Sequence, residues 1–217
     1  GSVRTIDWCP SRAALLTSGD DGAARIWQVT RQQPPRWELS ATLGAHCGGV
    51  RAAAWSPSGD SVLTGSADTT ACVWRRAAAA CDWELSARLI GHEAAVRAVA
   101  WSPDGGALLT AGDDATVRVW RTSGEGLWEE VAALECGGGC LAAVWAPDGC
   151  RLAAAGEDST VLIWELCEGD LSRWKLADSL QGHTGAVVSM AWCPEGRRLL
   201  TGGADRTARM WHTPPTL

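Results

Sequence analysis

The sequence contains no phenylalanine and no tyrosine, so of these three aromatic residue types only tryptophan is present, with 14 residues. Lysine and arginine form no run and the formal net charge is -6, so a phosphate-binding surface is not expected and nucleic acid is not an expected partner. No window approaches the roughly 18 consecutive apolar residues of a membrane-spanning helix. We therefore expect neither a membrane span nor a role in nucleic-acid binding.

The nine cysteines include no Cys-x-x-Cys pair. The least ordinary pair is Cys136 and Cys140, which flank three glycines, but a metal site there lacks further ligands nearby. We interpret the thiols as buried or tolerated in a reducing compartment and expect a cytoplasmic location. Neither a metal nor another cofactor is expected.

The tryptophans instead reveal an internal repeat, which decides the architecture. Successive members of a series are 47, 46, 44 and 47 residues apart in two of the three series. The first series lies just before a proline, at Trp8, Trp55, Trp101, Trp145 and Trp192. The second ends a Val-x-Val-Trp-like segment, at Trp27, Trp74, Trp120, Trp164 and Trp211. The third opens the Trp-Glu-Leu-Ser-like segments, at Trp37, Trp83, Trp128 and Trp174.

Each repeat predicts four short antiparallel strands separated by turns rich in glycine, proline and aspartate. The first strands are expected at Val3 to Trp8, Val50 to Trp55, Val96 to Trp101, Cys140 to Trp145 and Val187 to Trp192. The second strands are expected at Ala14 to Thr17, Ser61 to Thr64, Ala107 to Thr110, Arg151 to Ala154 and Arg198 to Thr201. The pattern predicts an all-β propeller of about five blades, the last lacking its outer strand. We expect one array over 1–217, with units at 1–43, 44–90, 91–134, 135–181 and 182–217.

One polar set recurs inside the repeat at fixed offsets, with its histidine 28 residues before its tryptophan. Its copies are His46, Thr64, Asp68 and Trp74; His92, Thr110, Asp114 and Trp120; and His183, Thr201, Asp205 and Trp211. A nucleophile triad is one interpretation of histidine, aspartate and a hydroxyl. The polar set occurs three times, which favours a structural role instead, because a catalytic site is built once. We expect each set to form a buried hydrogen-bonded relay.

The phrases Gly-His, Trp-Ser-Pro-Asp-Gly, Leu-Leu-Thr-x-Gly-x-Asp and Val-Arg-Val-Trp resemble the WD-repeat family of β-propellers over essentially the whole chain. The resemblance implies a docking platform, usually without enzymatic activity. It also implies that the chain is part of a longer, seven-bladed propeller, since family members most often have seven blades. The fourth unit departs from the pattern, with Cys136 in place of the histidine and Ala154 in place of the threonine, and we expect it to be the least rigid.

The resemblance further implies which positions line the top face of the propeller. One set lies five residues after the histidine position: Arg4, Arg51, Arg97, Leu141 and Val188. The other lies just before the turn aspartate: Asp20, Ala67, Asp113, Glu157 and Ala204. We expect the arginines and their apolar neighbours to bind other proteins, because arginine captures carboxylates in a bidentate manner. The alternative is that the arginines pair with the aspartates of the same face.

Within the family, the run Asp68 to Arg76 and the Asp-Trp-Glu-Leu connection at Asp82 are similar to the WD-repeat subunit of the cytosolic iron-sulfur assembly targeting complex. This likeness implies a non-enzymatic adaptor that helps deliver iron-sulfur clusters to client proteins. The alternative is a structural subunit of a large multiprotein assembly. An enzyme is not expected, because the sequence offers no once-only nucleophile and base, no phosphate loop and no sign of a small-molecule substrate.

Overall fold

The computed structural model describes residues 1–217 except 31, 78–81, 125 and 214–217. Within those residues the chain forms strands and turns, without a helix. The strands belong to five antiparallel sheets, four with four strands and one with three. No helix in the described part of the chain is long and apolar enough to cross a membrane.

The strands follow one another in chain order within each sheet, which we call a blade. Blade one consists of β1 (Val3–Trp8), β2 (Ala14–Gly19), β3 (Ala24–Val29) and β4 (Trp37–Leu43). Blade two consists of β5 (Val50–Trp55), β6 (Ser61–Ser66), β7 (Ala71–Arg76) and β8 (Trp83–Leu89). Blade three consists of β9 (Val96–Trp101), β10 (Ala107–Gly112), β11 (Thr116–Gly124) and β12 (Leu127–Glu135). Blade four consists of β13 (Cys140–Trp145), β14 (Arg151–Gly156), β15 (Val161–Cys167) and β16 (Asp170–Leu180), and blade five of β17 (Val187–Trp192), β18 (Arg198–Gly203) and β19 (Ala208–His212).

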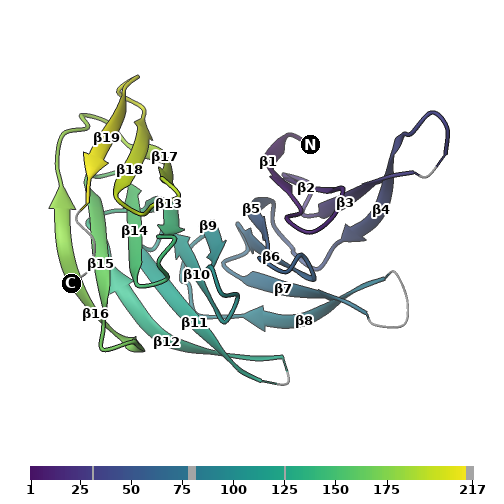
Figure 1. Ribbon diagram of the computed structural model, residues 1–217, viewed down its shortest axis with the longest axis horizontal. Helices are drawn as coiled ribbons and strands as arrows, with labels where there is room; N and C mark the ends of the chain where they lie inside the picture. The colour runs from purple at the N-terminus through teal and green to yellow at the C-terminus, as the bar shows by residue number, and fades with distance from the viewer. Residues whose placement is uncertain (31, 78–81, 125, 214–217) are drawn as a thin grey trace.

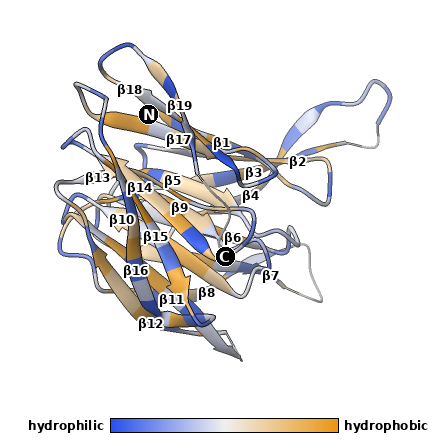
Figure 2. Cartoon of the chain, turned by 60° about the vertical axis from the view of Figure 1, so that its left-hand side comes forward, coloured by the Kyte–Doolittle hydropathy of each residue, from blue (hydrophilic) through white to orange (hydrophobic). Residues whose placement is uncertain are grey.

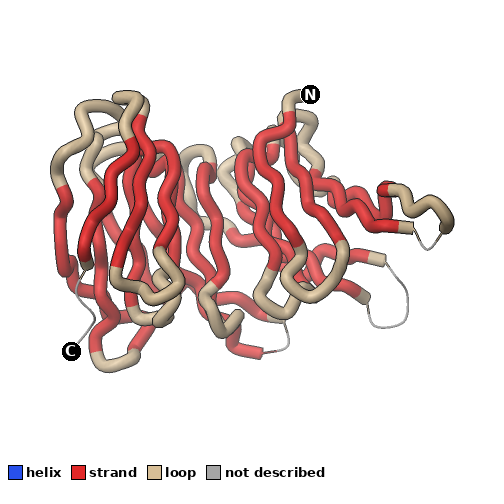
Figure 3. Tube along the Cα trace, turned by 45° about the horizontal axis from the view of Figure 1, so that its top comes forward, coloured by secondary structure: helices blue, strands red, loops and turns tan. Residues whose placement is uncertain are grey.

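The blades are arranged around a common axis, as in a propeller (Figure 1). The first strand of each blade is the inner one, and β1, β5, β9, β13 and β17 pack against one another in that order. Loops gather at the two ends of the strands, with the N-terminus at the upper row of loops in Figure 3 and the C-terminus near the lower one. The expected all-β propeller is confirmed, including the three-stranded last blade.

Both faces of a blade carry apolar residues, because alternate residues of each strand point to opposite faces, and in blades two to four both sets pack against neighbouring blades. Leu63 and Leu109, on the second strands of blades two and three, have no exposed surface. Hydrophobic colour follows the strands and hydrophilic colour the turns (Figure 2). Trp55, at the end of β5, is 6% exposed, whereas the equivalent Trp8 of blade one is 62% exposed. The difference shows how much surface one blade covers on the next.

The His-Thr-Asp-Trp relay ties the loop before an inner strand to the second and third strands of the same blade. In blade three the nitrogen Nε1 of Trp120 donates to Oγ1 of Thr110 at 3.0 Å, and that hydroxyl lies 2.8 Å from Nε2 of His92. The carboxylate of Asp114 can only accept, so Nδ1 of His92 carries the proton and donates to it at 2.7 Å. Nε2 of the neutral ring then accepts from the Thr110 hydroxyl. Each polar group of the relay thus has a hydrogen-bond partner within the relay.

The same relay is formed in blades two and five, with the predicted residues. His46 contacts Thr64 at 2.9 Å and Asp68 at 3.0 Å, and Trp74 donates to Thr64 at 3.0 Å. In blade five the His183 imidazole contacts Thr201 and Asp205 at 2.8 Å each, and Trp211 donates to Thr201 at 2.9 Å. Blade one keeps one link, from Trp27 to Thr17 at 2.9 Å, while Asp21 pairs with Arg25.

Burial and hydrogen bonding set the protonation of the relay. Burial lowers the pKa of His46 and of His92 below the ordinary value of 6.5, more than the adjacent aspartates raise it. Burial acts to raise the pKa of Asp68, but hydrogen bonds from Thr70 and from the Cys47 amide outweigh it and lower that pKa to about 2. In blades two and three the relay is therefore a neutral imidazole held by an ionised carboxylate.

The buried hydroxyl of Thr110 gives a test of the relay. Replacing Thr110 by valine keeps the shape but leaves the Trp120 indole and one His92 nitrogen without partners. We expect Thr110→Val to lower the free energy of unfolding by about 1–3 kcal/mol. Thr17→Val is the matched control, because it unpairs only the indole of Trp27 at a half-buried site. Urea denaturation of both variants should show the smaller loss for Thr17→Val, and equal losses would contradict the relay.

The lowered histidine pKa values predict how stability depends on pH. The unfolded chain binds protons at His46 and His92 as the pH falls through 6.5, while the folded chain does not. The free energy of unfolding should therefore fall as the pH drops from 7.5 towards 5.5, and fall again below 3.8 as aspartates such as Asp68 protonate in the unfolded chain. Urea denaturation across this pH range measures the slope. His92→Gln should reduce the slope near pH 6.5, and a rise in stability on acidification would contradict the argument.

Candidate functional site

A bulge at the start of each inner strand presents one side chain per blade on the same edge of the propeller. In blade two, Val50 pairs with Ser66 and Ala52 with Gly65, so Arg51 is left between two paired positions. The same shift occurs in the other four blades. A bulge turns the extra residue away from the ladder. The five residues so placed are Arg4, Arg51, Arg97, Leu141 and Val188.

These five residues, together with Asp20, Asp113 and Glu157 from the turns beside them, form what we call the rim. Arg4 binds Asp20 with two parallel hydrogen bonds, from Nε at 2.7 Å and from Nη2 at 2.8 Å. Arg51, from the next blade, donates to the same carboxylate at 3.0 Å. The hydrogen bond from Arg4 lowers the pKa of Asp20, which keeps the carboxylate ionised. Asp20 thus joins blades one and two through two guanidinium groups.

A second ion pair lies further along the rim. The guanidinium of Arg97 binds both carboxylate oxygens of Asp113, with nitrogen to oxygen distances of 2.7 to 2.9 Å. This hydrogen bonding raises the pKa of Arg97, and Glu157 of the next blade adds to the effect by its charge. The Arg97 and Asp113 side chains are 37% and 29% exposed. The arginines and aspartates of the rim therefore pair with each other, the alternative considered from the sequence, and remain within reach of a partner.

The rim becomes apolar beyond Arg97. Leu141 is half-buried and Val188 is 54% exposed, while Glu157 is exposed beside them. Ala67 and Ala204, at the turn positions equivalent to Asp20, provide no charge to pair with a guanidinium. The predicted residues thus lie on one edge, with charged pairs over blades one to three and aliphatic side chains over blades four and five.

Arginines between the blades were missed by the sequence reasoning. Arg12 of blade one lies over the rings of Trp55 and Trp83 at 5.7 and 6.0 Å, and Arg151 of blade four lies over Trp192 at 4.9 Å. These are cation–π contacts across a blade junction. The signal for Arg12 was available, since it occupies the turn position that is glycine in the other units.

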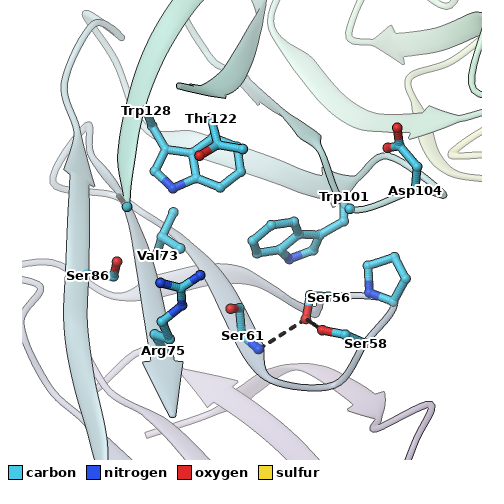
Figure 4. A pocket seen from close by; sticks show the side chains of 13 residues that line it. Ser56, Ser58, Ser61, Val73, Arg75, Ser86, Trp101, Asp104, Thr122 and Trp128 are labelled. Carbon is cyan, nitrogen blue, oxygen red and sulfur yellow. Dashed lines mark hydrogen bonds between the residues drawn. The ribbon is translucent and has the colours of Figure 1, made fainter. Parts of the chain in front are cut away.

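The junction between blades two and three contains a pocket of about 210 Å³. Trp101 and Trp128 meet edge to face on one side of it, with ring centroids 5.6 Å apart, and Arg75 and Ser61 lie opposite (Figure 4). The residues that line the pocket include no histidine and no cysteine. Three of its serines bond within one turn: the hydroxyl groups of Ser56 and Ser58 lie 3.1 Å apart, and the amide of Ser61 donates to Ser56 at 3.0 Å. The arrangement offers no activated nucleophile.

No group of three or more histidine, cysteine, aspartate or glutamate side chains that could hold a metal ion occurs in the described part of the chain. Cys136 and Cys140 lie together without a third such ligand. The rim itself presents charged pairs and aliphatic side chains.

Comparisons with known proteins agree with this architecture. The family model of the WD domain, G-beta repeat, matches residues 1–28, 37–75, 83–121, 130–165 and 174–212, which is most of the chain. Among solved structures, a chain in the "Crystal Structure of Mitotic Checkpoint Complex" is similar, with a TM-score of 0.83 and 23% sequence identity. The match covers 98% of this chain and 64% of that chain, so this chain spans less than two thirds of its length. No match was found among the curated proteins.

The exposure of the rim predicts that its ion pairs contribute little to stability. We expect Arg97→Gln to lower the free energy of unfolding by less than about 1 kcal/mol, because half-exposed pairs of this kind gain little over their hydrated state. Urea denaturation measures the effect. Arg118→Gln is a useful comparison, since Arg118 binds Glu130 at 2.7 Å with a side chain only 16% exposed. A larger loss for Arg97→Gln than for Arg118→Gln would make the rim pair a structural element.

Proposed function

The chain belongs to the WD domain, G-beta repeat family, and we propose that its rim is a docking surface for other proteins. Propellers of this family typically occur in protein–protein interaction scaffolds and in subunits of complexes, and these proteins are generally non-catalytic. The observation that carries the proposal is the graded rim, in which exposed bidentate arginine pairs lie beside exposed aliphatic side chains. Protein-binding surfaces combine these two kinds of group.

The geometry of the rim favours a partner with acidic groups followed by an apolar residue. A carboxylate of the partner can replace Asp20 or Asp113 on a guanidinium and keep the same bidentate geometry. The displaced aspartate returns to water, which costs little because the pair is partly exposed. An apolar side chain next to that carboxylate would then cover Leu141 or Val188.

A finer version of the proposal is an adaptor in cytosolic iron-sulfur cluster delivery to client proteins. Its support is the resemblance of the run Asp68 to Arg76, and of the Asp-Trp-Glu-Leu connection at Asp82, to the WD-repeat subunit of the cytosolic targeting complex. In this role the rim binds the client or the assembly machinery, and the cluster stays with the other proteins.

The second candidate is a structural subunit of a multiprotein assembly. The observation that favours it is the uncovered apolar surface on the outward faces of blades one and five. Ile6 and Trp8 on blade one are 64% and 62% exposed, and Leu200 and Met210 on blade five are 47% and 59% exposed. A subunit held through these faces does not depend on the rim.

Charge reversal on the rim tests the docking surface. We expect Arg51→Glu combined with Arg97→Glu to lose bound proteins on quantitative co-purification of a tagged chain, because the two introduced carboxylates repel the acidic groups of a partner. The matched control is Arg173→Glu with Lys175→Glu, which makes the same change of charge on the outer strand β16, where both side chains are more than half exposed. Circular dichroism establishes that each variant remains folded.

The outcomes separate the two candidates. Loss of substoichiometric partners in the rim variant alone supports the docking surface, and loss of iron-sulfur proteins in particular supports the adaptor. Retention of one stoichiometric assembly by both variants contradicts the rim proposal and favours the structural subunit.

A further inference from the structure

Two cysteines of blade four occupy neighbouring positions that hold other residues elsewhere in the chain. Cys136 takes the place of the relay histidine, 28 residues before Trp164. Cys140 takes the place of the valine that opens the inner strand in the other four blades. The equivalent Val50, like Cys140, has no exposed surface. Both substitutions thus fall in one blade. Together they place two thiols at the positions that a histidine and a valine occupy in blades two, three and five.

The two sulfur atoms contact each other. The Sγ atom of Cys140 lies 2.7 Å from that of Cys136, and both cysteines are free. Cys140 belongs to the core between blades three and four, while Cys136 is half-buried at the edge of that core. One thiol is therefore accessible from solvent and the other lies directly behind it.

The loop between the cysteines is held at both ends, which keeps the sulfurs in place. The amide of Cys136 donates to the carbonyl of Ala115 in blade three at 2.8 Å, and the amide of Glu157 donates to the carbonyl of Gly139 at 3.1 Å. A side chain at Gly156, beside the turn, would collide with the backbone carbonyl of Gly139. Glycine lets the short loop pass that close to the turn, so the approach of the two thiols is built into the backbone.

The relay that fixes this loop in other blades cannot form here. Ala154 has no hydroxyl to join the loop to the tryptophan, and the loop has no imidazole to bind Asp158. In blade three the amide after the histidine, that of Glu93, also donates to Asp114 at 3.0 Å. Blade four thus lacks the polar links at the site where the thiols meet.

We propose that Cys136 and Cys140 form a redox site, a dithiol that small-molecule disulfides oxidise to an intramolecular disulfide. The thiolate of Cys136 attacks one sulfur of the oxidant RSSR, the oxidant's S–S bond breaks, and RS⁻ leaves with the electron pair. Cys140 loses its proton to solvent and attacks the Cys136 sulfur, and a second RS⁻ leaves. The two cysteines are oxidised, RSSR is reduced to two thiols, and the new bond joins the loop to the inner strand in place of the relay.

The environment of the thiols sets the order of these steps. Cys136 is the half-buried sulfur, so it is the one that an oxidant reaches first. The hydrogen bond with Cys136 and burial raise the pKa of Cys140, so Cys140 acts second, once its neighbour carries the leaving group. Asp114 and Asp158, the carboxylates near the pair, act on Cys140 in the same direction.

The test is a titration of the whole chain in buffers of reduced and oxidised glutathione, followed by alkylation of free thiols and mass spectrometry of peptides. We expect the peptide with both cysteines to lose its two alkylation sites together and to lose the mass of two hydrogen atoms. Half-oxidation should need a ratio of oxidised to reduced glutathione at least about tenfold lower than modification of Cys150 or Cys193, because the second thiol is already in place.

Three variants keep the proposal open to refutation. Cys140→Ser should stop at a glutathione adduct on Cys136, Cys136→Ser should leave the buried Cys140 unmodified, and Cys150→Ser should oxidise like the parent chain. Because Cys140→Ser alters a core position, circular dichroism checks its fold, and Cys136→Ser gives an independent result at the half-buried position. A lasting glutathione adduct on Cys136 of the parent chain, or a pair that oxidises no earlier than Cys150, would overturn the proposal.

Discussion

Packing of one sheet against the next determines this fold, because each blade is apolar on both faces. An isolated four-stranded sheet of this kind would leave two apolar surfaces in water, so the blades are stable only as neighbours. The tryptophans pack in a repeated way within the blades. In each of the first four blades, the tryptophan that ends the inner strand meets a tryptophan of the outer strand edge to face, with centroids 5.4 to 5.7 Å apart.

The relay adds polar specificity to this apolar packing. A buried hydroxyl such as that of Thr110 is costly without partners, and the relay satisfies it with an indole on one side and an imidazole on the other. Its effect is local, since it joins strands and a loop of one blade and does not cross a junction. Blades one and four show the consequence, because they keep their packing while lacking the complete set.

The sequence predicted the blades well, because the tryptophan spacing reports directly on a repeated sheet. The inner strands begin and end at the predicted residues, whereas the second strands are two residues longer, as β2 (Ala14–Gly19) illustrates. The extension arises from the bulge, which lets Ser18 and Gly19 pair with Thr5 and Val3. That pairing depends on the partner strand and cannot be seen in one strand's pattern.

The candidate site was predicted less completely, for a related reason. The family resemblance placed Arg51 and Asp20 on one edge, but their ion pair crosses a blade junction, so it depends on how two sheets pack. The contact between Cys136 and Cys140 likewise depends on the path of three glycines, which sequence spacing leaves open. Linear periodicity fixes positions within a blade, and contacts between side chains require the packed backbone.

The bulge also explains why the rim can differ from blade to blade without affecting the fold. Val50 and Cys140, the residues just before the bulged position, are wholly buried and have little freedom to change. The bulged residue itself leaves the ladder and points outward, so arginine, leucine and valine are equally compatible with the sheet. Folding therefore does not determine the order of three arginines followed by two aliphatic residues. That order is the feature of the repeat on which the proposed docking surface depends.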